Sequence, residues 1–326
     1  MNGTNAKMEA AVLENFGGSK ELSLQTIPVP MIAPHEVLIQ VDYAGVGQWD
    51  IFEREGGYAE MLGTPQKFPY LLGSEGAGTI VKVGGGVLNF HVGDKVYGPG
   101  FLNPKGGFYA EYVAIDSQYL SIIPDTLSIQ EASTISGVGV TALRGLEDTL
   151  HLKKGESILI FGASGGVGHV AIQLAKIMGA KVFAVASGND GVALAEKSGA
   201  DKVIDGKKDD IMASALSFVP DGFDTALLTA GGDAAEKAIQ CVRKDGRVAY
   251  PFGIYPEPQK QKDKHITGFY GDPDSEIISR LNQYIGSGKL TVHIHETFPL
   301  RDVQHAHLAL TNHYVGKLCL KINDTI

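Results

Sequence analysis

The sequence has only two cysteines, no long apolar run and fewer basic than acidic residues, and each shortage excludes a class of protein. Cys241 and Cys319 are too few for a disulfide framework or a four-thiolate zinc site. A net charge of −9 argues against nucleic acid or an anionic membrane as the main partner. No apolar run is long enough to span a membrane, and the N-terminus lacks an apolar signal core. We therefore expect a cytoplasmic protein.

Glycine is abundant instead, and one glycine-rich stretch has strand character before it and helix character after it. Residues 156–161 form a short apolar run typical of a buried parallel strand, and apolar residues recur at helical spacing from Val167 onward. The glycines let the backbone turn and approach a bound group, while the first N–H groups of the helix favour an anion. We predict that this turn binds a dinucleotide pyrophosphate through Gly162, Ser164, Gly165, Gly166, Val167 and Gly168.

Strands and helices alternate after the turn, which predicts a doubly wound parallel sheet with its ligand at the carboxyl ends of the strands. The predicted strands are 158–161, 181–187, 202–205, 223–230, 247–253 and 265–270, with helices near 190–198, 207–218 and 233–244. Two strand ends supply further candidates for the cofactor site, with ordinary strand-end loops as the alternative interpretation. These candidates are Thr229, Ala230, Gly231, Gly232, Phe252 and Gly253.

The first 125 residues have a different pattern, with short β-type runs separated by glycine and proline, as in a small β-barrel-like domain. A helical stretch at 128–150 leads into the glycine turn, 274–288 is typical of a connecting helix, and the tail from Thr291 returns to β character. We predict an α/β protein with a β-rich catalytic domain at 1–125, a dinucleotide-binding domain at 126–288, and a return to the first domain at 289–326.

Together these residues resemble the medium-chain dehydrogenase/reductase superfamily over nearly the whole chain. The segments that carry the resemblance are 44–50, 72–84, 93–98, Thr141-Ala142, 162–168 and 298–307. The resemblance implies a GroES-like catalytic domain, a Rossmann nucleotide-binding domain inserted before its last strands, and a cleft between them.

Zinc enzymes of this superfamily place a cysteine at the position of Gly47 and a histidine at the position of Ser74, and neither residue here can replace that ligand. The closely spaced cysteines of a structural zinc lobe are absent too. The chain therefore resembles the zinc-free quinone oxidoreductases, with enoyl and alkenal reductases as relatives. The alternative of a zinc site built from His293, His295, His305 and His307 has no carboxylate or cysteine to complete it.

The residue after the second strand favours NADPH over NADH as cofactor. NADH-binding sites place an acid there for the ribose hydroxyl, whereas this strand is followed by Ser187, which tolerates a 2′-phosphate. Asp190 is close, and the lysine common in quinone reductases corresponds to Gly191. Lys207 and Lys208 are alternative sources of positive charge, so NADH stays open.

The resemblance also implies the substrate side of the site. Tyr58 matches one of two tyrosines of the family's substrate segment, while Phe52 replaces the other, and we predict that Tyr58 orients a substrate oxygen. Thr141 matches a residue near the nicotinamide, with a threonine bonded to its own helix as the alternative. Asp50 is interpreted as structural. Arg54 and Arg144 have no predicted role.

These observations predict an NADPH-dependent reductase of quinones or α,β-unsaturated carbonyls that works without zinc. An enoyl-thioester reductase and a non-catalytic nucleotide-binding protein on the same scaffold are the alternatives. The resemblance further implies a homodimer formed through the edge of the parallel sheet, to which 265–270 would contribute.

Overall fold

The structure is a computed structural model that describes residues 6–63, 67–288 and 290–323. The chain divides into two compact units. Unit 1 contains Met1–Gly137, Pro273–Ile278 and Ile294–Ile326, and unit 2 contains Val138–Asp272 and Ser279–His293. The domain boundaries expected at 125 and 288 stay predictions. Each unit is described here by itself.

Unit 1 is built on two sheets. In the smaller one, β1 (Lys7–Leu13) pairs antiparallel with β2 (Leu22–Pro28) and with β4 (Tyr70–Leu71). The larger has the order β15-β16-β3-β5-β6-β8, with β7 also paired to β3. Its strands are β3 (Glu36–Val46), β5 (Glu75–Val83), β6 (Lys95–Pro99), β7 (Tyr112–Asp116), β8 (Ser121–Ile122), β15 (Ile294–Pro299) and β16 (Lys317–Lys321).

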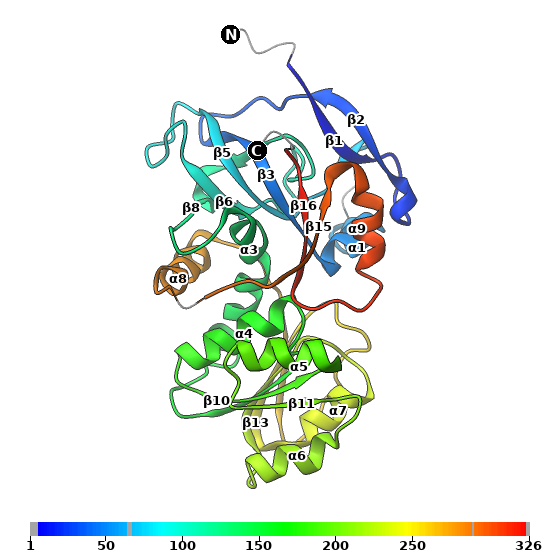
Figure 1. The fold of residues 1–326 in the computed structure, drawn as a ribbon, viewed down its shortest axis with the longest axis vertical. Helices are drawn as coiled ribbons and strands as arrows, with labels where there is room; N and C mark the ends of the chain where they lie inside the picture. Colours follow the sequence, from blue (N-terminus) through cyan, green and yellow to red (C-terminus); the bar gives the residue numbers. More distant parts are fainter. Residues whose placement is uncertain (1–5, 64–66, 289, 324–326) are drawn as a thin grey trace. The chain divides into compact units, whose positions relative to one another are not determined.

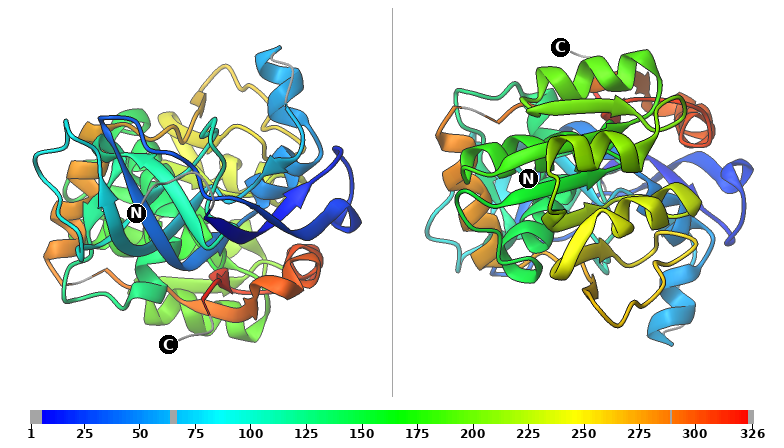
Figure 2. Two further views of the ribbon diagram at one scale, coloured as in Figure 1. Left: turned by 90° about the horizontal axis from the view of Figure 1, so that it is seen from above. Right: turned by 90° about the horizontal axis from the view of Figure 1, so that it is seen from below.

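The alternating residues Val37, Ile39 and Val41 of β3 are fully buried, so this central strand carries much of the core of unit 1. Short helices follow its end: α1 (Gln48–Arg54) and α2 (Gly57–Leu62), coloured light blue in Figure 2. The Asp50 carboxylate accepts a hydrogen bond from the Gly47 N–H at 2.7 Å, which fixes the first turn of α1. Near the C-terminus, α9 (Val303–Ala309) lies between β15 and β16 in the chain.

Unit 2 contains a parallel sheet whose strand order is β11-β10-β9-β12-β13-β14. The strands are β9 (Ser157–Phe161), β10 (Lys181–Ala186), β11 (Lys202–Asp205), β12 (Phe223–Leu228), β13 (Val242–Pro251) and β14 (His265–Phe269). The central residues Ile158, Leu159 and Ile160 are all fully buried, as expected for a strand covered on both faces. The predicted fold class, a β-rich GroES-like domain with a Rossmann-type sheet, is confirmed.

The connections of this sheet are helical: α4 (Gly166–Ile177), α5 (Gly188–Lys197), α6 (Ile211–Phe218) and α7 (Asp233–Gln240). α4 contacts α5, and α6 contacts α7. In Figure 1, α4 and α5 lie above β10 and β11, and α6 lies below them. Two further helices, α3 (Ile129–Leu143) and α8 (Ser275–Gly286), contribute residues to both units.

Several predicted element bounds are wrong at their ends. The strand expected at 265–270 ends at Phe269, and the helix expected at 233–244 ends at Gln240 because β13 begins at Val242. The strand expected to reach Ser187 ends at Ala186, because Ser187 is already the N-cap of α5. The strands expected to reach Ala230 and Gly253 end at Leu228 and Pro251, where glycine-containing turns begin.

The long helical stretch predicted before the glycine turn is α3 followed by a π-helical segment, Arg144–Thr149. Here the Thr149 hydroxyl donates to the Arg144 carbonyl at 2.8 Å. In the described part of the chain, no helix combines the length and apolar character that crossing a membrane requires.

Candidate functional site

The cofactor candidates of unit 2 gather at one edge of its sheet. Because β9, β10, β12 and β13 are parallel, their carboxyl ends meet at this edge. The turns that follow these four strands contain Gly162, Ser187, Ala230, Gly231, Phe252 and Gly253. The edge therefore brings together segments that lie far apart in the chain, from Gly162 to Gly253.

The glycine turn after β9 has the geometry that a pyrophosphate needs. Gly162 has a φ of +77°, which favours glycine, and Gly165 is the N-cap of α4 without a side-chain hydrogen bond. A Cβ on Gly168 would lie 2.3 Å from the Gly162 carbonyl oxygen, so the helix can approach the turn only because this residue has no side chain. The first N–H groups of α4 are left for an anion, and the residues present fit a dinucleotide.

The turn after β12 closes onto the glycine turn. The Thr229 hydroxyl donates to the carbonyl oxygens of Phe161 at 3.0 Å and Gly162 at 3.1 Å. A Cβ on Gly231 would lie 2.2 Å from the Pro256 carbonyl oxygen, so the backbone needs glycine here. The neighbouring Ala230 is thereby held at the strand edge. Thr229 belongs to the strand-end run that the sequence indicated for the nicotinamide half.

The remaining two candidates of unit 2 lie near the end of β14. The ring of Phe252 is 43% exposed and tilts against Tyr270 with the ring centroids 4.6 Å apart. Thr141 is buried beside Gly271, where an added Cβ would lie 2.5 Å from the Thr141 hydroxyl oxygen. The exposed aromatic face of Phe252 is thus placed in unit 2 to contact a planar ring.

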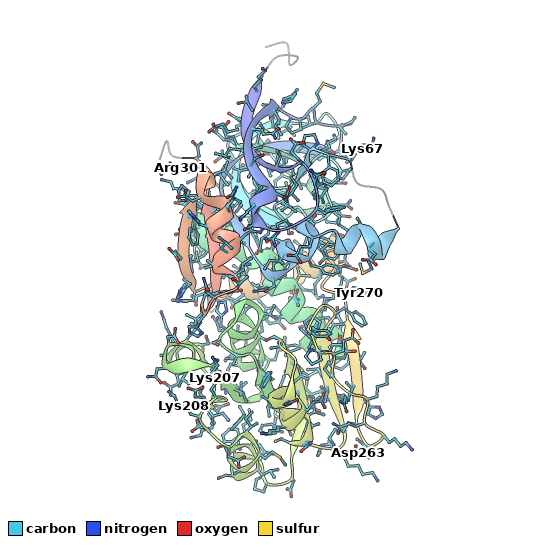
Figure 3. The ribbon with its side chains drawn as sticks, turned by 90° about the vertical axis from the view of Figure 1, so that its right-hand side faces the viewer. Lys67, Lys207, Lys208, Asp263, Tyr270 and Arg301 are labelled. Atoms are coloured by element: carbon cyan, nitrogen blue, oxygen red, sulfur yellow. The ribbon has the colours of Figure 1, made fainter. Side chains whose placement is uncertain are left out.

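The loop after β10, expected to lie at the cofactor ribose, has two charged residues from the end of the next strand beside it, Lys208 and Asp205. Lys208 Nζ donates to Asn189 Oδ1 at 2.7 Å and lies 3.2 Å from Asp205 Oδ2. Asp205 ends the next strand, β11, and its other oxygen accepts the Gly188 N–H at 3.3 Å. Figure 3 shows Lys207 and Lys208 near one another at this end of unit 2. Ser187 follows β10 directly, and the acid Asp205 reaches this loop from the neighbouring strand.

In unit 1, two acids of α1 share one hydroxyl. Asp50 and Glu53 are one turn apart and point inward, 0% and 5% exposed. The Ser74 hydroxyl oxygen lies 3.0 Å from Asp50 Oδ1 and 3.3 Å from Glu53 Oε2. Burial raises the pKa of Asp50 to about 6, although the hydrogen bond from the Gly47 N–H and the charge of Lys317 act to lower it. Burial, together with the charge of Asp50, raises the pKa of Glu53 to about 7.

Glu53 also faces a small recess in unit 1. The Tyr70 hydroxyl donates to the Glu53 carboxyl, and burial beside Glu53 raises the pKa of Tyr70. The recess is a hollow of about 160 Å³ that includes open solvent and has no interior space for a whole water molecule. It is lined by Phe16, Glu53, Tyr58, Ala59, Tyr70 and Leu102. The ring of Tyr58 packs edge-on against Phe52 and Phe101, with 4.8 Å between ring centroids in each pair. Tyr58 is therefore held at a recess that also contains a carboxyl group.

A second buried acid, Glu75, has a cation as its partner. Glu75 is fully buried, and its Oε1 lies 2.8 Å from Lys317 Nζ. Its other oxygen accepts hydrogen bonds from the Gly137 N–H at 2.8 Å and the Ser136 hydroxyl at 3.2 Å. Lys317 lies over the ring of Trp49, 4.7 Å from its centroid.

The structure places the two arginines that had no predicted role. The Arg54 guanidinium donates to the Gly17 carbonyl at 2.8 Å and lies 3.1 Å from His307 Nδ1. Burial, with the charge of Arg54, lowers the pKa of His307 to about 3, so this histidine is neutral. In unit 2, Arg144 pairs with Asp148 at 2.8 Å.

Comparison with known proteins agrees with this geometry. Residues 33–125 match the alcohol dehydrogenase GroES-like domain, and residues 166–269 match the zinc-binding dehydrogenase family. An alcohol dehydrogenase of Geobacillus stearothermophilus is 34% identical over 77% of this chain and 79% of its own. The chloroplastic NADPH-dependent alkenal/one oxidoreductase of Arabidopsis thaliana is 31% identical over 96% of this chain and 79% of its own.

Among solved structures, a quinone oxidoreductase of Coxiella burnetii is 30% identical, covers 98% of this chain and 100% of its own, and superposes with a TM-score of 0.86. The chain belongs to the medium-chain dehydrogenase/reductase superfamily. The matches place it in the quinone oxidoreductase branch, as predicted from its motifs. It is an oxidoreductase of this superfamily.

In this medium-chain dehydrogenase/reductase, the two positions that carry zinc ligands in zinc enzymes are occupied by other contacts. A Cβ on Gly47 would lie 2.8 Å from the indole ring of Trp49, so the ring fills the space of a side chain here. The Ser74 hydroxyl is engaged by Asp50 and Glu53. Within residues 6–63, 67–288 and 290–323, no group of three or more His, Cys, Asp or Glu side chains is placed to hold a metal ion.

The histidines considered as an alternative metal set take different partners. His307 lies against Arg54, and His295 stacks at a tilt on Tyr314 with 6.4 Å between ring centroids. The His293 N–H donates to His169 Nε2 at 3.2 Å within unit 2.

Proposed function

We propose that this protein is an NADPH-dependent reductase that transfers a hydride to a quinone or α,β-unsaturated carbonyl without zinc. The observation that carries the proposal is the replacement of both zinc-ligand positions next to a recess that contains Tyr58. Gly47 is packed against Trp49, and Ser74 binds two carboxyl groups. Without a Lewis acid, an alcohol is a poor substrate, whereas a conjugated acceptor is already electrophilic.

The residues of this chain have separate tasks in such a reaction. The nicotinamide, when bound, supplies the hydride. The glycine turn from Gly162 to Gly168 and the start of α4 hold the pyrophosphate, while Thr141, Ala230, Gly231, Phe252 and Gly253 line the nicotinamide half. Tyr58, half-buried between two aromatic rings, donates a hydrogen bond to the substrate oxygen. These roles are supported by the turn geometry and by the aromatic packing.

The proposal is tested with purified protein, NADPH and a panel of acceptors. We expect NADPH oxidation with quinones and alkenals, no reduction of NADP⁺ by simple alcohols, and unchanged rates after treatment with a zinc chelator. Enoyl thioesters belong in the panel because an enoyl-thioester reductase is the alternative enzyme. Turnover of alcohols only, lost on chelation and restored by zinc, would contradict the proposal.

We also propose that Lys208 favours NADPH by reaching the 2′-phosphate at the loop after β10. Its Nζ already lies at that loop, 2.7 Å from Asn189 Oδ1, and the side chain is exposed. Lys208→Ala should raise the KM for NADPH about tenfold, the effect of losing one charge-assisted contact, and leave the KM for NADH unchanged. Lys197→Ala, an exposed lysine at the end of α5, is the matched control. An equal change for both cofactors would show that Lys208 does not read the phosphate.

A homodimer in the cytoplasm completes the proposal. β14 is the last strand of its sheet order, so its outer edge offers unpaired backbone groups to a second copy. Light scattering coupled to size exclusion checks this, and a monomer at micromolar concentration would refute it.

A further inference from the structure

The oxygen contacts around Ser74 need one more proton than the hydroxyl groups supply. Three contacts join four side chains: Tyr70 to Glu53, Ser74 to Glu53 and Ser74 to Asp50. Each hydroxyl has a single proton, so Tyr70 and Ser74 can fill only two of the three contacts. The third contact becomes a hydrogen bond when one of the two carboxyl groups is protonated. The geometry therefore points to a stored proton on the Asp50–Glu53 pair.

Among the described residues, the cations near the pair already have partners. Lys317, whose charge acts on Asp50, is paired with Glu75, and Arg54 is engaged by Gly17, Glu55 and His307. The titratable groups of the described chain that also act on the pair are Glu75, Tyr70 from β4 and Tyr109 from the segment before β7. Both tyrosines are neutral at physiological pH. Two buried carboxyl groups without a cation share a proton more readily than they both ionise.

Of the two acids, Glu53 is the one with an outlet. Asp50 is closed off, with one oxygen on the Gly47 N–H and the other on Ser74. Glu53 lines the recess together with Tyr58 and contacts Tyr70, which lines it too. The pKa values of about 6 and 7 agree with a proton that stays bound near neutrality.

We propose that Glu53 is the proton reservoir for the reduced substrate and delivers its proton through the Tyr70 hydroxyl. This inference rests on the proposed reductase function. After hydride transfer the acceptor oxygen carries a negative charge. For this step the Tyr70 hydroxyl turns from Glu53 to the acceptor oxygen, and protonated Glu53 donates to the Tyr70 oxygen. The Tyr70 O–H bond breaks as its proton forms a new O–H bond on the product, and the Glu53 O–H bond breaks as its proton restores Tyr70. Glu53 is left as a carboxylate and regains a proton from water.

The test compares Glu53→Gln with Glu60→Gln, which changes an exposed glutamate on α2 outside the recess. With a quinone or enone and saturating NADPH, we expect wild-type kcat to fall above about pH 7 as Glu53 ionises. Glu53→Gln should lower kcat about 100-fold near neutral pH, remove this pH dependence and leave KM within a few-fold. Glu60→Gln should match the wild type.

Two further variants separate delivery from folding. Tyr70→Phe should lower kcat as much as Glu53→Gln, and the double variant should show no additional loss, because both residues act in one relay. Asp50→Asn should retain activity but move the fall in kcat to lower pH, because Glu53 then lacks the neighbouring charge that favours its protonated form. Circular dichroism melts establish that each variant is folded.

A direct readout of the stored proton needs neither cofactor nor substrate. Infrared difference spectra of the protein alone should show the carbonyl stretch of a protonated carboxylic acid that disappears across neutral pH, and Glu53→Gln should lack this band. If wild type reduces no quinone or enone, the proposed function and the relay both fail. If wild type is active but Glu53→Gln keeps its kcat and pH profile, or the band is absent, the relay alone is wrong.

Discussion

Ser74 and Glu75 are neighbours in the chain, yet they belong to two buried acidic arrangements that differ in what neutralises the charge. Glu75 is paired with Lys317 at 2.8 Å. On the other side, Ser74 bridges Asp50 and Glu53, and no cation of the described residues forms an ion pair with either acid. Burying a carboxylate is costly unless something compensates it. Lys317 keeps Glu75 ionised. A proton neutralises the pair Asp50 and Glu53 instead, and that proton can leave.

The largest effect is expected from removing the fixed cation. Lys317→Met leaves Glu75 buried and unpaired, which should lower the free energy of unfolding by about 3–5 kcal/mol at pH 7. Urea denaturation measures the loss. The double variant Glu75→Gln/Lys317→Met removes both charges and should recover most of the stability. A single variant as stable as wild type would show that Lys317 does not compensate Glu75.

A smaller effect on the free energy of unfolding, with the opposite sign, is expected from replacing Glu53, which a proton neutralises. The pKa of Glu53 is raised from its ordinary 4.5 to about 7, so between these values the folded state binds more protons than the unfolded state. The contribution of Glu53 to stability is therefore complete below pH 4.5 and is lost as the pH rises through 7. Between pH 5 and pH 8 this effect should lower the free energy of unfolding of the wild type by on the order of 2 kcal/mol. Glu53→Gln should not show this loss.

Denaturant unfolding at both pH values checks this second prediction. Glu60→Gln, an exposed control, should follow the pH dependence of wild type. If Glu53→Gln and wild type lose the same stability between pH 5 and pH 8, Glu53 is not protonated in the folded protein at the lower pH.

The sequence predicted the sheet of unit 2 better than the buried acids of unit 1, for a physical reason. The glycine turn from Gly162 to Gly168 is a local pattern, since the strand, the turn and the helix follow one another in the chain. The pairing of Glu75 with Lys317 joins β5 to β16, and only the antiparallel pairing of both strands with β3 brings them near each other. No local pattern encodes such a contact.

The Asp50–Glu53 pair is intermediate between a local sequence pattern and a contact that depends on strand pairing. Asp50 and Glu53 are three residues apart, a spacing that places two side chains on one face of a helix, but α1 is only seven residues long and was not predicted. Asp50 was interpreted as structural, which agrees with its hydrogen bond to the Gly47 N–H. The contact of Tyr70 with Glu53 was not predicted, because it depends on the pairing of β4 with β1. The available signal in the sequence was the spacing of the two acids, Asp50 and Glu53.

Removing the Ser74 hydroxyl, which contacts both acids, should have a moderate effect on stability. Ser74→Ala removes the hydroxyl that contacts both acids, leaving buried oxygens without a donor, and should lower the free energy of unfolding by about 1–2 kcal/mol at pH 7. The loss should grow at pH 8, where both acids are ionised and need a donor most. Chemical denaturation at the two pH values measures it. A loss independent of pH would mean that Ser74 contributes through packing alone.

The smallest effect is expected where an ion pair is exposed, and it separates burial from pairing as the cause of the larger ones. Arg243 and Asp224 pair at 3.0 Å in unit 2, close to the 2.8 Å of Glu75 and Lys317, but their side chains are 44% and 28% exposed. Water already solvates such charges, so Arg243→Gln should change the free energy of unfolding by less than about 1 kcal/mol. Denaturation in low and high salt checks this, because the small contribution should vanish as salt screens it. A loss as large as that of Lys317→Met would mean that contact distance, not removal from water, sets the strength of these pairs.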